Sequence, residues 1–225
     1  MVDTPLTPAA ARLAQVRSQI AAAAHDARRS VEDVTLIAVS KTQPPAAIAA
    51  LIAAGQRDFG ENRVQEMNDK WPALRSAHPD VRLHMIGQLQ SNKAEDAVRL
   101  ADAIHSVDRP SLVTALARAM DRLGRRLPCF IQVNLAGEGQ KGGCPPAGMA
   151  ALLAESRAAG LDIVGLMTVP PLELEPAPWF ALLDKLAGDH GLPGRSMGMS
   201  GDYGTAVRLG ATHVRVGTAL FGARD

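Results

Sequence analysis

The sequence is poor in aromatic residues and carries almost no excess charge of either sign. Aromatic residues make up 3% of the 225 residues, which argues against the stacking platforms that bind single-stranded nucleic acid. Lysine and arginine number 24 against 23 acidic residues, so the net charge is +1. A chain of this balance has no broad electrostatic footprint for nucleic acid. We therefore expect no nucleic-acid partner.

Cysteine is scarce, and long apolar runs are missing. The two cysteines, Cys129 and Cys144, exclude a disulfide-rich scaffold and favour a cytoplasmic location. No apolar run approaches the roughly 20 residues that a membrane helix needs. The segment MVDTPLTPAA at the N-terminus lacks the charged and apolar regions of a secretory signal. We expect a cytoplasmic protein with no membrane contact.

Several common catalytic motifs are also missing from the sequence. It has no GxGxxG after the first predicted strand, no GxxxxGK[ST] loop, no HExxH and no GxSxG. The six histidines show no spacing typical of metal ligands. His84 and His105 lie inside predicted strands, where a core histidine with satisfied hydrogen bonds is commoner than a ligand. We assign no metal ligand.

Apolar, β-branched runs alternate with helical stretches along the chain. The runs predict strands over 34–40, 57–60, 82–87, 102–107, 128–135, 161–169, 195–199 and 212–217. The intervening patterns predict helices over 44–54, 63–77, 92–100, 110–123, 145–159, 176–190 and 202–209, after an N-terminal helix within residues 1–30. We predict an α/β fold, a single (β/α)8 TIM barrel domain over residues 1–225 with an extra N-terminal helix. An open doubly wound sheet is the alternative.

A lysine stands at the end of the first predicted strand. Lys41 follows an apolar run and precedes Pro44-Pro45. A lysine buried at a strand end has a lowered pKa, and its free amine is a nucleophile toward carbonyl carbon. One interpretation is therefore a Schiff base with an aldehyde or ketone. The other is a lysine whose amine extends to solvent.

Small residues follow the last two predicted strands. Ser200 and Gly201 come just before a predicted helix, and Gly217 and Thr218 follow the last strand. Backbone N–H groups in such turns can hold a phosphate, and barrels often carry a phosphate site after strands seven and eight. Glycines that merely form tight turns are the alternative.

Arg215 and Asn62 are two further candidates for a ligand site. Arg215 lies within the last predicted strand on the same face as Gly217, and it points either toward the barrel mouth or outward to an acidic residue. Asn62 follows the second predicted strand. As the residue before a helix, it is expected to cap that helix more readily than to contact a ligand.

Six segments together resemble one known family. The segments AVSKTQP, DFGENRVQE, HMIGQLQSNK, GLMTVPP, MGMSGD and VRVGTALFGARD are similar to the pyridoxal-phosphate homeostasis proteins, in the same order along the chain. These are proteins of the alanine-racemase-like barrel that bind pyridoxal 5′-phosphate (PLP). The resemblance runs from about residue 34 to the C-terminus.

The resemblance implies a role for each candidate residue. It implies that Lys41 holds PLP as a Schiff base, that Arg215 faces the pyridine nitrogen and that Asn62 lies near the cofactor. The phosphate is then held by Ser200, Gly217 and Thr218. Lys141 resembles a second family lysine, either a transient PLP acceptor or a solvated loop residue.

The resemblance and the residues favour a PLP carrier over a catalyst, so no catalytic residue is assigned. An arginine beside the ring nitrogen disfavours the protonated ring that makes PLP an effective electron sink. Racemases with this arginine use a second base, a tyrosine from an added domain. We expect no such domain here, because the sequence ends at Asp225, soon after the last predicted strand, and its one tyrosine, Tyr203, lies on the phosphate side.

The expected function is therefore reversible PLP binding within intracellular PLP homeostasis. PLP-dependent apo-enzymes are candidate partners, and a monomer is the favoured oligomeric state. Two alternatives stay open. One is a small PLP-dependent racemase or lyase that uses Lys41 alone, and the other is a Schiff-base aldolase that acts on a phosphorylated sugar without PLP.

Overall fold

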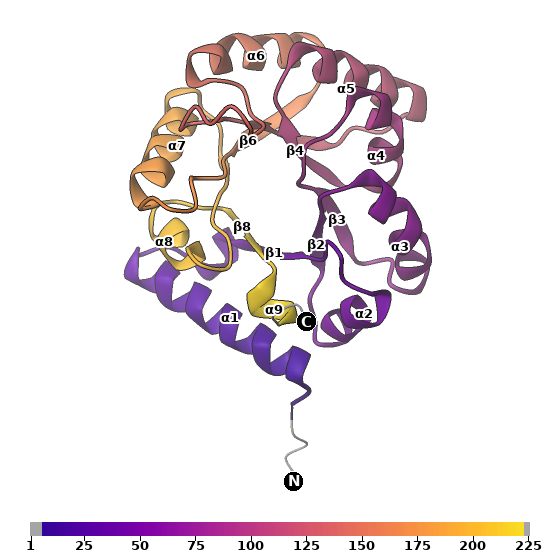
Figure 1. Ribbon diagram of the computed structural model, residues 1–225, viewed down its shortest axis with the longest axis vertical. Helices are drawn as coiled ribbons and strands as arrows, with labels where there is room; N and C mark the ends of the chain where they lie inside the picture. The colour runs from indigo at the N-terminus through magenta and orange to yellow at the C-terminus, as the bar shows by residue number, and fades with distance from the viewer. Residues whose placement is uncertain (1–5, 223–225) are drawn as a thin grey trace.

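The computed structural model describes residues 6–222, and within this range eight parallel strands close into a barrel. Figure 1 looks along the barrel, with the strands around the centre and the helices outside them. Each strand pairs with the next, and β1 pairs with β8, so the ring has no open edge. The predicted (β/α)8 barrel is confirmed, and the open-sheet alternative is wrong. The strands are β1 Thr35–Val39, β2 Asp58–Glu61, β3 Arg82–Met85, β4 Ala103–Val107, β5 Pro128–Gln132, β6 Asp162–Met167, β7 Gly194–Ser196 and β8 His213–Val216.

Helices connect the strands and form the outer layer of the barrel (Figure 1). They are α1 Pro8–Asp26, α2 Pro45–Ala53, α3 Val64–Ala77, α4 Ala94–Leu100, α5 Pro110–Leu123, α6 Pro146–Ala158, α7 Ala177–Asp189, α8 Tyr203–Arg208 and α9 Thr218–Phe221, with short 3-10 turns at Val31–Asp33 and Ser91–Lys93. The predicted range 110–123 coincides with α5, because its apolar residues repeat at helical spacing and Gly124 ends it in a left-handed conformation.

The predicted N-terminal helix is α1, which packs against α8 and α9 at the join between the first and last strands (Figure 1). Leu13, Val16 and Ile20 are buried along one face of it. The helix ends at Asp26, and Arg28 adopts a left-handed φ of 55° two residues later. Residues 1–5 and 223–225 of the predicted domain lie outside the described part, and the organisation of residues 1–225 as one domain stays a prediction.

Three elements at the carboxyl end of the barrel differ most from the prediction. The seventh strand was predicted over 195–199 but ends at Ser196, since Gly198 turns the chain with a φ of 93°. The fifth strand ends at Gln132, three residues before its predicted end. The short helix α9, which begins at Thr218, was missed because four residues carry no helical period. All three differences lie where loops form the barrel mouth.

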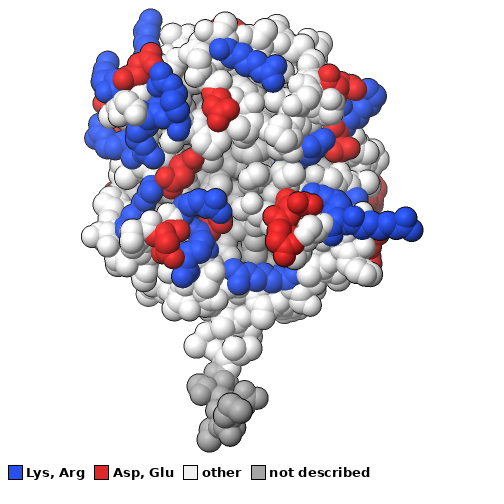
Figure 2. All heavy atoms as spheres, turned by 180° about the vertical axis from the view of Figure 1, so that it is seen from behind, with Lys and Arg blue, Asp and Glu red and all other residues white. Residues whose placement is uncertain are grey.

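The surface matches the balanced composition. Figure 2 shows blue and red side chains side by side over one face of the molecule, with no area of a single sign spreading across it. Among the described residues, no helix is long and apolar enough to cross a membrane. Both cysteines, Cys129 and Cys144, are buried free thiols.

Candidate functional site

All six residues that the sequence singled out line one cavity at the carboxyl ends of the strands. Its volume is about 520 Å³, within the range of small-molecule sites. Val39, Ile86 and Val169 contribute apolar walls. The six predicted positions are Lys41, Asn62, Ser200, Arg215, Gly217 and Thr218. The closure of the barrel therefore brings together residues from both ends of the sequence.

Lys41 reaches the cavity because it continues the alternation of the first strand. Ile37 is fully buried, Val39 lines the cavity, and Lys41 is the next residue of the same parity. The lysine is half-buried and follows the fully buried Ser40. Its side chain therefore lies within the cavity mouth, as the interpretation with a reactive amine requires.

A buried carboxylate anchors the backbone beneath Lys41. The Oε1 atom of Glu61 accepts hydrogen bonds from Ser40 Oγ at 2.8 Å and from Trp71 Nε1 at 3.1 Å. Lys70 Nζ lies 2.7 Å from the same oxygen and donates to the Ser40 carbonyl at 3.0 Å. Ser40 is therefore held at its side chain and at its carbonyl, which fixes the position from which Lys41 projects.

A second contact holds the residue after Lys41. Thr42 has a left-handed φ of 62°, a conformation that is unfavourable for a β-branched residue. Its N–H donates to Glu66 Oε2 at 2.6 Å, and Glu66 is paired with Lys70 at 2.9 Å. Sequence reasoning missed Lys70 and its partners. The only signal was the Glu66–Lys70 spacing of four residues, which is common on exposed helix faces.

The turns after β7 and β8 meet at Ser200. The Gly217 N–H donates to Ser200 Oγ at 3.0 Å, so the hydroxyl ties the two turns together. Among the described residues, the N–H groups of Thr218 and Ala219 donate no hydrogen bond. The predicted phosphate turn is thus a place where backbone donors face a cavity without protein acceptors.

Arg215 points into the barrel, so the alternative prediction, that it points outward to an acidic residue, is wrong. The side chain is 5% exposed. Its Nη1 donates to Ser196 Oγ at 2.7 Å and its Nη2 donates to the Thr168 carbonyl at 2.8 Å. Burial lowers the pKa of Arg215 from 12.5 to about 10, against the opposing effect of Asp202. The guanidinium therefore remains a cation at neutral pH.

Asn62 does not cap a helix, contrary to the expectation from its position. Helix α3 begins at Val64, and its N-cap residue is Arg63, without a side-chain hydrogen bond. The Oδ1 atom of Asn62 is buried and has no partner within residues 6–222. A Cβ atom on Gly87 would lie 2.2 Å from the Asn62 carbonyl oxygen, so only glycine allows this close approach. The carboxamide is left available to a ligand.

Lys141 lies apart from these residues. Its Nζ is 2.6 Å from Glu138 Oε2 and donates to the Pro170 carbonyl at 3.0 Å. The side chain is partly buried in the loop after β5 and is not among the residues that line the cavity.

Comparisons with known proteins identify the family of the chain. Residues 12–225 match the alanine racemase N-terminal domain family. The pyridoxal phosphate homeostasis protein of Pseudomonas aeruginosa is 42% identical over 96% of this chain and 96% of its own length. That of Escherichia coli K12 is 41% identical over 95% of each.

Solved structures give the same result. PipY of Synechococcus elongatus PCC7942 with PLP bound is 42% identical, with a TM-score of 0.85 over 95% of this chain and 100% of that one. An alanine racemase of Clostridium difficile 630, 14% identical with a TM-score of 0.69 over 92% of this chain and 56% of its own, shares the fold. The chain belongs to the pyridoxal phosphate homeostasis protein family, within the alanine racemase N-terminal domain family.

Proposed function

We propose that this protein binds PLP reversibly through Lys41 and takes part in intracellular PLP homeostasis. The observation that carries the proposal is the donor set of one cavity, which combines an amine, a buried guanidinium and unpartnered backbone N–H groups. PLP offers an aldehyde, whose carbon forms a Schiff base with an amine as water leaves, and hydrolysis reverses the reaction. The relatives are named for PLP homeostasis, and PipY has been solved with PLP bound.

We assign each residue a role by the chemistry it offers. The Ser200 hydroxyl and the N–H groups around Gly217 and Thr218 suit the phosphate, since backbone donors stabilise an anion. Arg215 suits the ring nitrogen, and the unpartnered Asn62 carboxamide suits a polar ring substituent. Lys41, which follows β1 next to the turn after β8, suits the aldehyde.

The arrangement of proton-transfer groups supports a carrier over a racemase or lyase. The titratable residues that line the cavity are Lys41 and Arg215, and Arg215 stays charged at neutral pH. A charged guanidinium at the ring nitrogen disfavours protonation of that nitrogen. Tyr203 directs its hydroxyl to Gln19 on α1. The side chains around the cavity thus favour retention of PLP over proton removal from a bound amino acid.

We further propose a cytoplasmic monomer that transfers PLP to apo-enzymes. Buried free thiols at Cys129 and Cys144 suit a reducing compartment. The mouth is the exposed side of the cavity, with Thr218 at the surface. Release there would deliver the cofactor to a recipient. Mixing the loaded protein with a PLP-dependent apo-enzyme, alongside an equal amount of free PLP, tests delivery.

The absorption spectrum of the protein incubated with PLP tests the central proposal. We expect a protein-bound band near the visible edge that survives gel filtration and is lost in Lys41→Ala. Lys185→Ala, at an exposed pair on α7, is the matched control and keeps the band. A wild-type protein without the band would favour the PLP-free aldolase. A band accompanied by amino-acid racemisation at an enzymic rate would favour the racemase.

A further inference from the structure

A chain of hydrogen bonds runs through the barrel interior and ends on Arg215. Asp58 Oδ1 lies 3.0 Å from His84 Nε2, and His84 Nδ1 lies 3.0 Å from His105 Nε2. His105 Nδ1 lies 2.8 Å from Ser196 Oγ, which accepts from Arg215 at 2.7 Å. Five strands, β2, β3, β4, β7 and β8, each contribute one member. We name Asp58, His84, His105 and Ser196 the interior column.

Each end of the interior column acts in one direction only. Arg215 can only donate, so Ser196 accepts from it, and the Asp58 carboxylate can only accept, so His84 carries a proton on Nε2. A hydroxyl can accept two hydrogen bonds and donate one, so Ser196 can bond both Arg215 and His105 Nδ1 whichever nitrogen of His105 carries the proton.

The surroundings of His105 keep that ring neutral. It is fully buried and stacked on Phe130, with ring centroids 4.2 Å apart. Burial first, and then His84, His213 and Arg215, lower the pKa of His105 well below its ordinary value.

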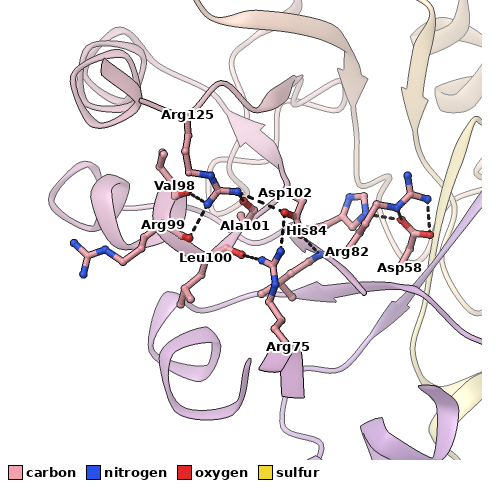
Figure 3. Close-up of polar contacts among 11 residues, drawn as sticks. Asp58, Arg75, Arg82, His84, Val98, Arg99, Leu100, Ala101, Asp102 and Arg125 are labelled. Atoms are coloured by element: carbon pink, nitrogen blue, oxygen red, sulfur yellow. Dashed lines mark hydrogen bonds and ion pairs between the residues drawn. The ribbon is translucent and has the colours of Figure 1, made fainter. Parts of the chain in front are cut away.

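The far end of the interior column reaches solvent on the opposite side of the barrel from Lys41. Figure 3 shows Asp58 between His84 and Arg82 at this end. Arg82 Nε pairs with Asp58 Oδ1 at 2.9 Å, and the Arg82 side chain is 64% exposed. Burial raises the pKa of Asp58, but the hydrogen bonds and charges of His84 and Arg82 outweigh it and lower the pKa overall. A carboxylate thus anchors this end.

We propose that the interior column is a positioning device for Arg215, which holds the guanidinium in one orientation toward the ligand. The ligand is PLP, so this inference rests on the proposed function. Neither histidine lines the cavity, and both act on the ligand only through Ser196 and Arg215. Without the Ser196 contact, the guanidinium keeps the Thr168 carbonyl as its one fixed acceptor within residues 6–222 and can turn about that bond.

The tautomers test the device in the protein without PLP. Long-range proton–nitrogen NMR of the full chain with nitrogen-15 histidine, at pH 7.5, reports which ring nitrogen carries the proton. We expect His84 to carry a proton on Nε2, the atom that faces Asp58, and His105 to carry a single proton. An unprotonated His84 Nε2 or a doubly protonated His105 would overturn the inference. Because no ligand is present, this measurement stands whether or not the protein binds PLP.

PLP affinity tests the effect on Arg215. Ser196→Ala removes a charge-assisted hydrogen bond and is expected to weaken PLP binding about tenfold to a hundredfold. Ser196→Thr keeps the hydroxyl and should recover most of the affinity. Ser156→Ala is the matched control, since that buried hydroxyl bonds to the Leu152 carbonyl within α6. It should leave PLP affinity unchanged.

A histidine variant keeps the inference testable if Ser196→Ala folds poorly. His105→Phe retains a ring on Phe130 and removes both hydrogen bonds. Like Ser196→Ala, it should weaken PLP binding, and it should also shift the absorption maximum of the bound cofactor. Wild-type affinity in both His105→Phe and Ser196→Ala would overturn the inference. A wild-type protein that fails to bind PLP would instead overturn the proposed function.

Discussion

The two ends of the barrel differ in how they satisfy their polar groups. At the carboxyl ends of the strands, Asn62 Oδ1 is buried without a partner within residues 6–222, and the N–H group of Thr218, a residue that lines the cavity, donates no hydrogen bond in that range. At the amino ends, Asp58 and His84 are fully engaged with each other and with their neighbours. Buried polar groups are costly without partners. The described buried side-chain oxygens without a partner lie at or beyond the carboxyl ends of their strands, and of these residues Asn62 lines the cavity; the set is Glu61, Asn62, Ser106, Gln132 and Glu138.

Among the variants that test this comparison of the two ends, the largest effect on the free energy of unfolding is expected at Lys70. Lys70→Met leaves the Glu61 carboxylate buried and without its cation. Loss of one member of a buried pair costs about 3–5 kcal/mol, so urea unfolding should show a decrease of that size in the free energy of unfolding. The double variant Glu61→Gln/Lys70→Met should recover much of it.

The control for this prediction is an exposed pair. Lys185→Met breaks the exposed contact with Asp189 on α7 and should change the free energy of unfolding by less than about 1 kcal/mol. Equal losses at Lys70 and Lys185 would show that the Glu61 pair does not anchor the Lys41 turn.

The next largest effect is expected from acid, which should lower the free energy of unfolding through His213. Burial, with His84 as a further cause, lowers the pKa of His213 to about 4 in the folded protein, against 6.5 for an ordinary histidine. Between these values the unfolded chain binds the extra proton, so stability is full above pH 6.5 and falls as pH decreases to 4. The loss is about 3 kcal/mol for this one group.

Urea unfolding at several pH values measures this loss. His213→Gln should flatten the decrease by as much as about 1.4 kcal/mol per pH unit, the value for one proton. His25→Gln, at an exposed position on α1, is the control and should follow the wild type. Parallel curves for all three proteins would exclude His213 as a source of acid sensitivity.

A smaller effect is expected at Asn62, where PLP affinity and the free energy of unfolding should change independently of each other. Asn62→Ala removes a carboxamide with an unmet buried oxygen. The free energy of unfolding should stay constant or rise, whereas PLP affinity should fall about tenfold, the cost of one hydrogen bond. Ser156→Ala should show the reverse, with lower stability and unchanged affinity. A parallel loss of both properties in Asn62→Ala would make its role structural.

The smallest effect is expected from thiol reagents, which should react little with the two cysteines of the folded protein. Burial raises the pKa of Cys129 to about 12 and that of Cys144 to about 11, so neither is a thiolate at neutral pH. Thiol reagents at pH 7.5 should modify the folded protein only slowly and the urea-unfolded protein quickly. Rapid modification of the folded protein would show that the chain opens near one of these residues.

The elements of the fold were predictable because their signals are local. Helix α5 was predicted to the residue, since apolar spacing and the terminal Gly124 both lie within the segment itself. The end of β7 was not, because Gly198 turns where its carbonyl meets the Arg215 N–H of the next strand. For Asn62 the rule for helix N-caps gave the wrong prediction. The residue lines the cavity, and Arg63 is the N-cap of α3.

The alternation of strands and helices and the chemistry at each strand end could be predicted from the amino-acid sequence, because both depend on neighbouring residues. The closed barrel was needed to show that one chain beneath Arg215 is formed by Asp58, His84, His105 and Ser196. It was also needed to show that Lys70 and Glu61 hold the Lys41 turn. These contacts join side chains of separate strands and helices, and their distances are fixed only once the barrel closes.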